Sequence, residues 1–197
     1  MATLPEPRLA FPDRVRLPLA FDPVRLAADL AVFESDEWIA HFVTQNYEGD
    51  WSALPLRAQA GATHPIQMIY SPPGATEFVD TPFLARAPYF AEVIAAFQCP
   101  VTCVRLMRLT PGSAIKEHSD HDLAAEEGVA RIHVPVLSND GVEFHLNRVP
   151  VAMKPGETWY LRLADPHSVT NGGDADRVHL VIDVVVDDWF EDLLRHG

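Results

Sequence analysis

Apolar positions along the chain follow two different periods, and the change between them falls at about residue 100. Before that point, apolar residues recur every three to four positions, as on one face of a helix. After Pro100, short runs of apolar or alternating residues end at Pro-Gly, Asn-Asp-Gly and Asn-Gly-Gly turns, which is typical of antiparallel strands. The pattern therefore predicts helices in the first half and a β-rich second half.

Caps and turns indicate where the elements begin and end. Asp22-Pro23 resembles an N-cap followed by proline at the first helical position, which predicts a helix over 23–34. We expect an irregular arm over the first twenty residues, short strands at 51–58 and 66–70, and helices around Trp38 and Phe42 and from Thr81 to Cys99, with a break at Pro88. The expected later strands are 101–109, 113–118, 129–137, 142–146, 150–153, 158–163, 167–171 and 177–186. So many short strands predict a barrel or jelly-roll sandwich with the helices outside one sheet.

Composition narrows the class of protein. The chain has 197 residues, 48% of them hydrophobic, which is enough for one buried core. We expect a single domain over 1–197, in which 1–100 packs on a catalytic core at 101–190. The net charge of −13 argues against a nucleic-acid partner, and the lack of a long apolar run argues against a membrane span. We expect a cytoplasmic protein in which Cys99 and Cys103 stay reduced.

Two later strands divide cleanly into an apolar and a polar face. In 129–137, Arg131 and His133 lie on the polar face, because residues two apart on a strand point the same way. In 177–186, the polar face carries Arg177, His179 and Asp183. We expect the polar faces to line a cavity. A buried guanidinium needs an anionic partner, so Arg131 and Arg177 are candidate carboxylate receptors.

A metal site is predicted by His118, Asp120 and His167. The first two share one face if the strand continues through them, and the third begins a later strand. Two imidazoles and one carboxylate form the facial triad of non-haem Fe(II) oxygenases. His121 and Asp122 compete for these roles, and Glu143 with His145 could form a second site, although exposed positions are the simpler interpretation for all four. His41, His64, His179 and His196 receive no role.

At this point the motifs resemble those of a known family. RLTPGSAIKEHSD, RIHVPV, KPGETWYLR, PHSVTNGG and RVHLVIDVVVDDW, together with the segment from FDPVRLAADL to EGDWSALPLRA, are similar to the aspartyl/asparaginyl β-hydroxylase family, which includes bacterial cis-proline hydroxylases. The resemblance implies a double-stranded β-helix that uses Fe(II) and 2-oxoglutarate. It implies that His118, Asp120 and His167 hold the metal. By the same likeness, Arg177 and His133 would bind 2-oxoglutarate, and Arg131 would pair with a substrate carboxylate.

The activity that the resemblance implies is hydroxylation of an unactivated C–H bond with dioxygen, releasing succinate and CO2. The substrate would be an amino acid or a peptidyl group that bears a carboxylate. The animal aspartyl hydroxylases lack the acidic ligand, so Asp120 favours the proline hydroxylase branch and a small amino acid. Met107 stands where the animal enzymes have a serine that helps to bind 2-oxoglutarate. Two alternatives stay open: a cupin-like metalloenzyme that needs no 2-oxoglutarate, and a non-catalytic metal and 2-oxoglutarate sensor.

Overall fold

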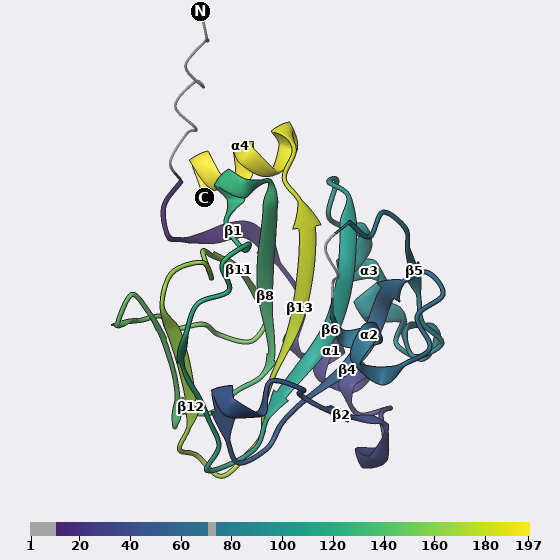
Figure 1. Cartoon of the computed structure of the whole chain (residues 1–197), viewed down its shortest axis with the longest axis vertical. Coiled ribbons are helices and arrows are strands. Elements are labelled where there is room, and N and C mark those ends of the chain that lie inside the picture. The colour runs from purple at the N-terminus through teal and green to yellow at the C-terminus, as the bar shows by residue number, and fades with distance from the viewer. Residues whose placement is uncertain (1–10, 71–73) are drawn as a thin grey trace, which may run out of the picture.

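Two antiparallel sheets face each other in the computed structural model, which describes residues 11–70 and 74–197 (Figure 1). The larger sheet has eight strands in the order β1-β11-β8-β13-β6-β4-β2, with β5 paired to β4, and the smaller has five in the order β10-β9-β12-β7-β3. The strands are β1 (Arg14–Ala20), β2 (Ile39–Ala40), β3 (Tyr47–Glu48), β4 (Trp51–Gln59), β5 (Phe78–Asp80), β6 (Val101–Leu109), β7 (Ala114–His118), β8 (Val129–Leu137), β9 (Val142–Leu146), β10 (Val149–Pro150), β11 (Glu157–Leu161), β12 (His167–Asn171) and β13 (Arg177–Val185). This arrangement confirms the mainly β jelly-roll prediction.

The helices are α1 (Pro23–Leu30), α2 (Pro65–Ile69), α3 (Pro88–Ala95) and α4 (Asp188–His196), with 3₁₀ turns at Ser35–Glu37, Thr44–Asn46, Leu84–Arg86 and Ala125–Glu127. As expected, α1 and α3 pack on the outer face of the larger sheet, together with α4, whereas α2 packs on its inner side, where Ile69 joins the inner apolar cluster. Leu26 of α1, Phe90 of α3 and Phe190 of α4 are buried in one core with side chains of β6, β8 and β13. Free Cys99 and Cys103 are buried as well. Among the described residues, no helix is both long and apolar enough to cross a lipid bilayer.

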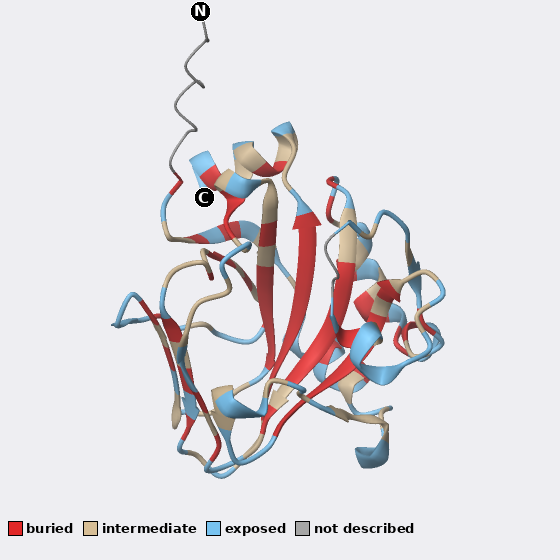
Figure 2. Cartoon of the chain, in the orientation of Figure 1, coloured by how far each residue is buried: buried red, intermediate tan, exposed pale blue. Residues whose placement is uncertain are grey.

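The central strand β13 is buried along nearly its whole length (Figure 2), and its two faces meet different surroundings. Val178, Leu180, Ile182 and Val184 point into the outer core beneath the helices. The alternate residues, from Arg177 to Asp183, point between the sheets, where a second apolar cluster includes Val181, Met107 and Phe144. Strand alternation therefore divides apolar from polar side chains as the sequence predicts, and the polar side faces the interior.

The structure corrects several expected elements in the first half. Residues 14–20 form β1, paired with β11, where an irregular arm was expected; residues 1–10 of that arm lie outside the described residues. The expected strand at 66–70 is helix α2, because Pro65 occupies its first turn and the His64 ring accepts a hydrogen bond from the Ile66 amide. The short apolar run there fits either element, and its local capping favours the helix.

Other expected elements differ from the structure in extent or kind. The helix predicted around Trp38 and Phe42 is only the 3₁₀ turn Ser35–Glu37, after which the chain extends into β2 and pairs with β4. The Glu34 and Glu37 capping box is satisfied within that single turn. The predicted break at Pro88 is the start of α3, and the predicted strand 150–153 shrinks to Val149–Pro150. Helix α4, capped by Asp187, was not predicted.

Candidate metal centre and its cavity

The three predicted metal ligands come together at one end of the smaller sheet. His118 is the last residue of β7 and His167 the first of β12, and the two residues are direct cross-strand partners. Asp120 lies just beyond β7, where its backbone amide donates a hydrogen bond to the Leu163 carbonyl oxygen at 2.8 Å. One ligand atom from each residue lies within 4.8 Å of the other two. Asp120 therefore reaches the site from a loop, not from the strand continuation that we expected.

Both imidazoles are oriented by contacts with backbone carbonyl oxygens two residues earlier in the chain. Nδ1 of His118 lies 2.7 Å from the Lys116 carbonyl oxygen, and Nδ1 of His167 lies 3.0 Å from that of Asp165. A carbonyl oxygen only accepts, so each Nδ1 carries the proton and each Nε2 keeps its lone pair. Nε2 of His118 lies 3.8 Å from Asp120 Oδ1. The geometry thus directs two Nε2 atoms and one carboxylate oxygen at a common point, the donor set of a divalent metal centre.

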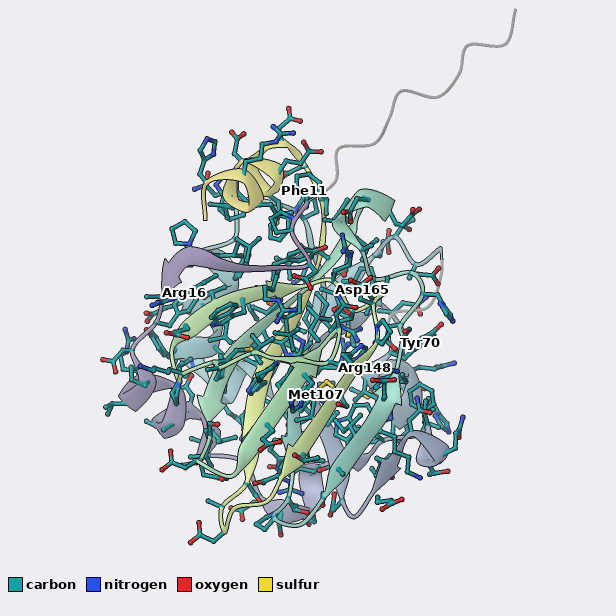
Figure 3. The ribbon with its side chains drawn as sticks, turned by 90° about the vertical axis from the view of Figure 1, so that its left-hand side faces the viewer. Phe11, Arg16, Tyr70, Met107, Arg148 and Asp165 are labelled. Atoms are coloured by element: carbon teal, nitrogen blue, oxygen red, sulfur yellow. The ribbon has the colours of Figure 1, made fainter. Side chains whose placement is uncertain are left out.

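The triad opens into a cavity of about 620 Å³ between the two sheets. Aromatic and apolar side chains form much of its wall, among them Met107, which lies in the middle of the molecule (Figure 3). The His41 and Trp51 rings stack on the same wall with centroids 3.5 Å apart. The charged and polar lining includes His118, Asp120, His167, Arg105, Arg131, His133, Arg177 and Asp183. Every residue predicted to bind a metal, cosubstrate or substrate therefore lines one cavity.

Arg177 begins β13 and is buried without a counter-ion in the described part of the chain. The residue is 3% exposed, and its Nε atom has no hydrogen-bond partner there. Its Nη2 lies 2.9 Å from Nδ1 of His179. Burial lowers the pKa of Arg177 to about 9, with no carboxylate among the described residues to oppose the shift. The guanidinium is still cationic at neutral pH, and no anion within residues 11–70 and 74–197 compensates its desolvation.

His133 and His179 form a buried neutral pair next to Arg177. Their Nδ1 atoms lie 3.3 Å apart, and His133 Nε2 has no partner. Burial and the Arg177 charge hold the pKa of each imidazole well below its ordinary value. Both rings are therefore uncharged. The sequence placed His179 on the polar face but assigned it no role, because an i, i+2 contact between an arginine and a histidine has no distinctive motif.

Arg131 has carboxylates of the chain itself as partners. Its Nε and Nη2 donate to the two oxygens of Asp183 at 2.7 and 3.0 Å, and its Nη1 lies 3.3 Å from Asp120 Oδ2. Arg105, which sequence reasoning missed, donates to Asp183 Oδ2 at 3.1 Å and lies 3.1 Å from the Cys103 sulfur. The two guanidiniums hold the pKa of Asp183 far below its usual value despite full burial. The predicted need of Arg131 for an anion is thus met within the protein.

The remaining candidates lie away from the ligand cluster. His121 is exposed in the loop after β7, and Asp122 is exposed at the cavity lining. Glu143 and His145 alternate on β9 with Phe144 and Leu146, which point into the inner apolar cluster, so the two polar residues face outward. His41 was assigned no role, yet it lines the cavity, and burial lowers its pKa to about 4.

Comparisons with known proteins agree with this architecture. The chain is 30% identical over 179 residues to L-proline cis-4-hydroxylase of Rhizobium meliloti (strain 1021) and 25% identical over 177 residues to L-proline cis-3-hydroxylase 2 of a Streptomyces species. These alignments cover 89% and 88% of this chain but only 62% and 60% of the relatives, so the chain spans less than two thirds of their length.

Solved structures with the same fold include two oxygenases. A 2OG-Fe(II) oxygenase family oxidoreductase from Burkholderia pseudomallei matches with a TM-score of 0.53 and 19% identity, covering 87% of this chain and 85% of that one. A viral collagen prolyl hydroxylase from Paramecium bursaria Chlorella virus 1, solved as a 2OG complex, matches with a TM-score of 0.51 and 9% identity, covering 89% and 97%. Residues 25–186 match the model of the aspartyl/asparaginyl β-hydroxylase family, and the chain therefore belongs to that family.

Proposed function

We propose that this protein is an Fe(II)- and 2-oxoglutarate-dependent dioxygenase that hydroxylates a small amino acid carrying a carboxylate. The observation that carries the proposal is the pairing of two features in one cavity. The first is a triad whose two imidazoles and one carboxylate present their ligand atoms together. The second is Arg177, a buried cation that lacks an anionic partner among the described residues.

The residues present fit both the metal and the cosubstrate. His118, Asp120 and His167 would hold Fe(II), which is the usual metal for two histidines and one carboxylate with open positions. The orphaned Nε of Arg177 would bind the distal carboxylate of 2-oxoglutarate, because a guanidinium recognises a carboxylate through paired N–H donors. His133 Nε2, also without a partner, would lie against the end of the cosubstrate at the metal. When bound, the metal supplies the activation of dioxygen that the side chains cannot provide.

The substrate would be recognised by charge on the opposite side of the cavity. Arg105 and Arg131 share the single carboxylate Asp183, which leaves one positive charge in this cluster when Asp120 is committed to a metal. A substrate carboxylate would balance that charge, so we retain Arg131, together with Arg105, as the proposed receptor. The named relatives act on L-proline, which makes free L-proline the first substrate to test. The free buried cysteines fit a reducing compartment, and we propose the cytoplasm.

The test is an anaerobic Fe(II) titration with and without 2-oxoglutarate. Chelation of Fe(II) by a 2-oxo acid gives a visible absorption band, and we expect a band that requires both components. Succinate release in air should then depend on an added amino acid, beginning with L-proline. His167→Ala is the matched control, because it removes one metal ligand and should abolish the band while the fold remains.

Each other outcome selects a different function. Tight iron binding without a 2-oxoglutarate-dependent band would overturn the proposal in favour of a cupin-like metalloenzyme. A band without succinate release for any of the proteinogenic amino acids would favour a sensor. A band that persists in His167→Ala would show that the metal lies elsewhere.

A further inference from the structure

His179 is hydrogen-bonded to Arg177 but, unlike Arg177, is not among the residues that line the cavity. It lies two residues along β13 on the same inward face, and it is 2% exposed. Its Nδ1 is the hydrogen-bond partner of the Arg177 guanidinium in the described part of the chain. The cross-strand neighbour of His179 on β6 is Met107, whose thioether is a weak acceptor. His179 is therefore the group that fixes the direction of the Arg177 side chain from within the chain.

Donor and acceptor rules settle the protonation of this pair. A guanidinium has five N–H donors and no acceptor, so His179 Nδ1 must accept from Arg177 Nη2. His179 is accordingly the Nε2–H tautomer, with its Nδ1 lone pair directed at Arg177. Because that lone pair is already engaged, the 3.3 Å contact with His133 Nδ1 does not set the tautomer of His133.

The choice of a neutral acceptor has an electrostatic effect. A carboxylate in place of His179 would hold Arg177 equally well but would neutralise it, as Asp183 does for Arg105 and Arg131. An uncharged imidazole fixes the orientation and leaves the full positive charge for an incoming anion. Prearranged direction reduces the side-chain entropy lost on binding, and an uncompensated buried charge strengthens the attraction.

We propose that His179 is a positioning residue that aims Arg177 at the distal carboxylate of a dicarboxylic 2-oxo acid and so sets the preference for that cosubstrate class. This inference rests on the proposed function, because it assumes that Arg177 receives the carboxylate. A residue that merely packed in the core would contribute to folding but not to the discrimination between ligands. The distinction can be measured without turnover.

The experiment is isothermal titration calorimetry of the full chain loaded with Mn²⁺, which occupies oxygen and nitrogen sites. The ligands are 2-oxoglutarate and oxalate. Oxalate chelates a metal but has no distal carboxylate, so it reports on the metal centre alone. The variants are His179→Asn, which keeps an acceptor close to the Nδ1 position, His179→Leu, which removes it, and His179→Asp, which keeps it and adds negative charge.

We expect the affinity for 2-oxoglutarate to fall by about 10-fold in His179→Leu and by about 100-fold in His179→Asp, and to stay within about 3-fold in His179→Asn. Oxalate affinity should change by less than about 2-fold in all three, because the triad lies on β7, on the loop that follows it and on β12. The ratio of the two dissociation constants is thus the readout that a structural role would not move.

Two results would overturn the inference. One is 2-oxoglutarate binding by His179→Leu at the wild-type affinity. The other is equal binding by His179→Asn and His179→Asp, which have the same size and differ in charge, and this comparison holds even if the leucine variant fails to fold. Failure of the wild-type protein to bind 2-oxoglutarate, with oxalate bound normally, would instead contradict the proposed function.

Discussion

Two arginine environments in the same cavity differ in how the charge is compensated. Arg105 and Arg131 share Asp183 in a cluster that is almost completely closed to solvent, with the Asp183 side chain 2% exposed. Arg177 is equally buried but has only the neutral His179 as a partner in the described chain. Both environments are costly to form, because each takes a guanidinium out of water. In the first the protein supplies the anion, and in the second the anion must come from outside.

The difference separates a cluster that carries an anion of its own, Asp183, from a cation whose charge only a ligand can balance. A compensated buried cluster contributes to stability only as a unit, and it loses that contribution when one member is removed. An uncompensated buried cation lowers stability in the free protein and becomes favourable when an anion binds. Opposite responses to mutation should therefore distinguish the two arginine environments.

The largest effect is expected for Asp183→Asn, which leaves two buried guanidiniums without their counter-charge. We expect the free energy of unfolding to fall by about 3–5 kcal/mol. Urea denaturation of the metal-free protein at pH 7 measures this. The matched control is Asp80→Asn in the Arg57–Asp80 pair, whose aspartate side chain is 56% exposed, where the loss should be below about 1 kcal/mol. Equal losses of unfolding free energy in the two variants would show that burial does not increase the contribution of the Arg105, Arg131 and Asp183 cluster to stability.

A smaller effect of opposite sign is expected for Arg177→Met. Methionine fills a similar volume without a charge, so we expect the free protein to gain about 1 kcal/mol or more in stability. Affinity of the Mn²⁺-loaded protein for 2-oxoglutarate should fall by at least about 30-fold, because a buried charge-assisted pair is lost. Urea denaturation and calorimetry give the two numbers. A loss of stability in Arg177→Met would show instead that Arg177, like Asp183, stabilises the free protein.

The last prediction concerns the pH dependence of stability and extends the comparison to a buried titratable base, His41. Burial lowers the pKa of His41 to about 4, against 6.5 in the unfolded chain. Between these values the unfolded chain binds the proton first, so stability falls as the pH falls from 6.5 towards 4. His133 and His179 shift in the same direction and add to the wild-type slope.

His41→Phe isolates this contribution, because phenylalanine can keep the stacking on Trp51 and has no charge. From pH 7 to pH 5, the metal-free wild-type protein should lose about 1–2 kcal/mol more than His41→Phe. Urea denaturation at the two pH values supplies the comparison. Parallel losses would mean that His41 keeps an ordinary pKa in the folded protein.

The second half of the fold was predictable because its strands alternate strictly and end at strong turn signals. β6, β8, β9 and β12 begin and end at the expected residues. The first half was less predictable because its short apolar runs depend on tertiary partners. The stretch that forms β1 alternates between buried Val15 and Leu17 and more exposed neighbours, a signal that its prolines obscured. Helix α4 has an aspartate cap and a strong apolar face. It was nevertheless missed, because it begins so soon after the buried strand β13 that the change of period was not recognised.

The candidate site shows the same division between local pattern and long-range contact. Alternation on β8 and β13 identified the cavity-facing Arg131, His133 and Arg177 without any knowledge of pairing. The partner of Arg131 was not predictable, since Asp183 reaches it only through the register that aligns β13 with β8. Arg105 was missed because β6 is largely apolar around it, and its two arginines, Arg105 and Arg108, lie three residues apart and so do not follow the period of a strand face.

The cross-strand pairing of His118 with His167 has a consequence for the order of events as the chain folds. Strands that are distant in sequence pair late, because a long loop must close before their contacts form. An unfinished or partly opened chain therefore offers His118 and Asp120 without the second imidazole. Binding of a metal ion would then be coupled to completion of the smaller sheet, because the ion links a ligand on β7 to a ligand on β12. A redox-active ion would be retained only by molecules that have finished folding.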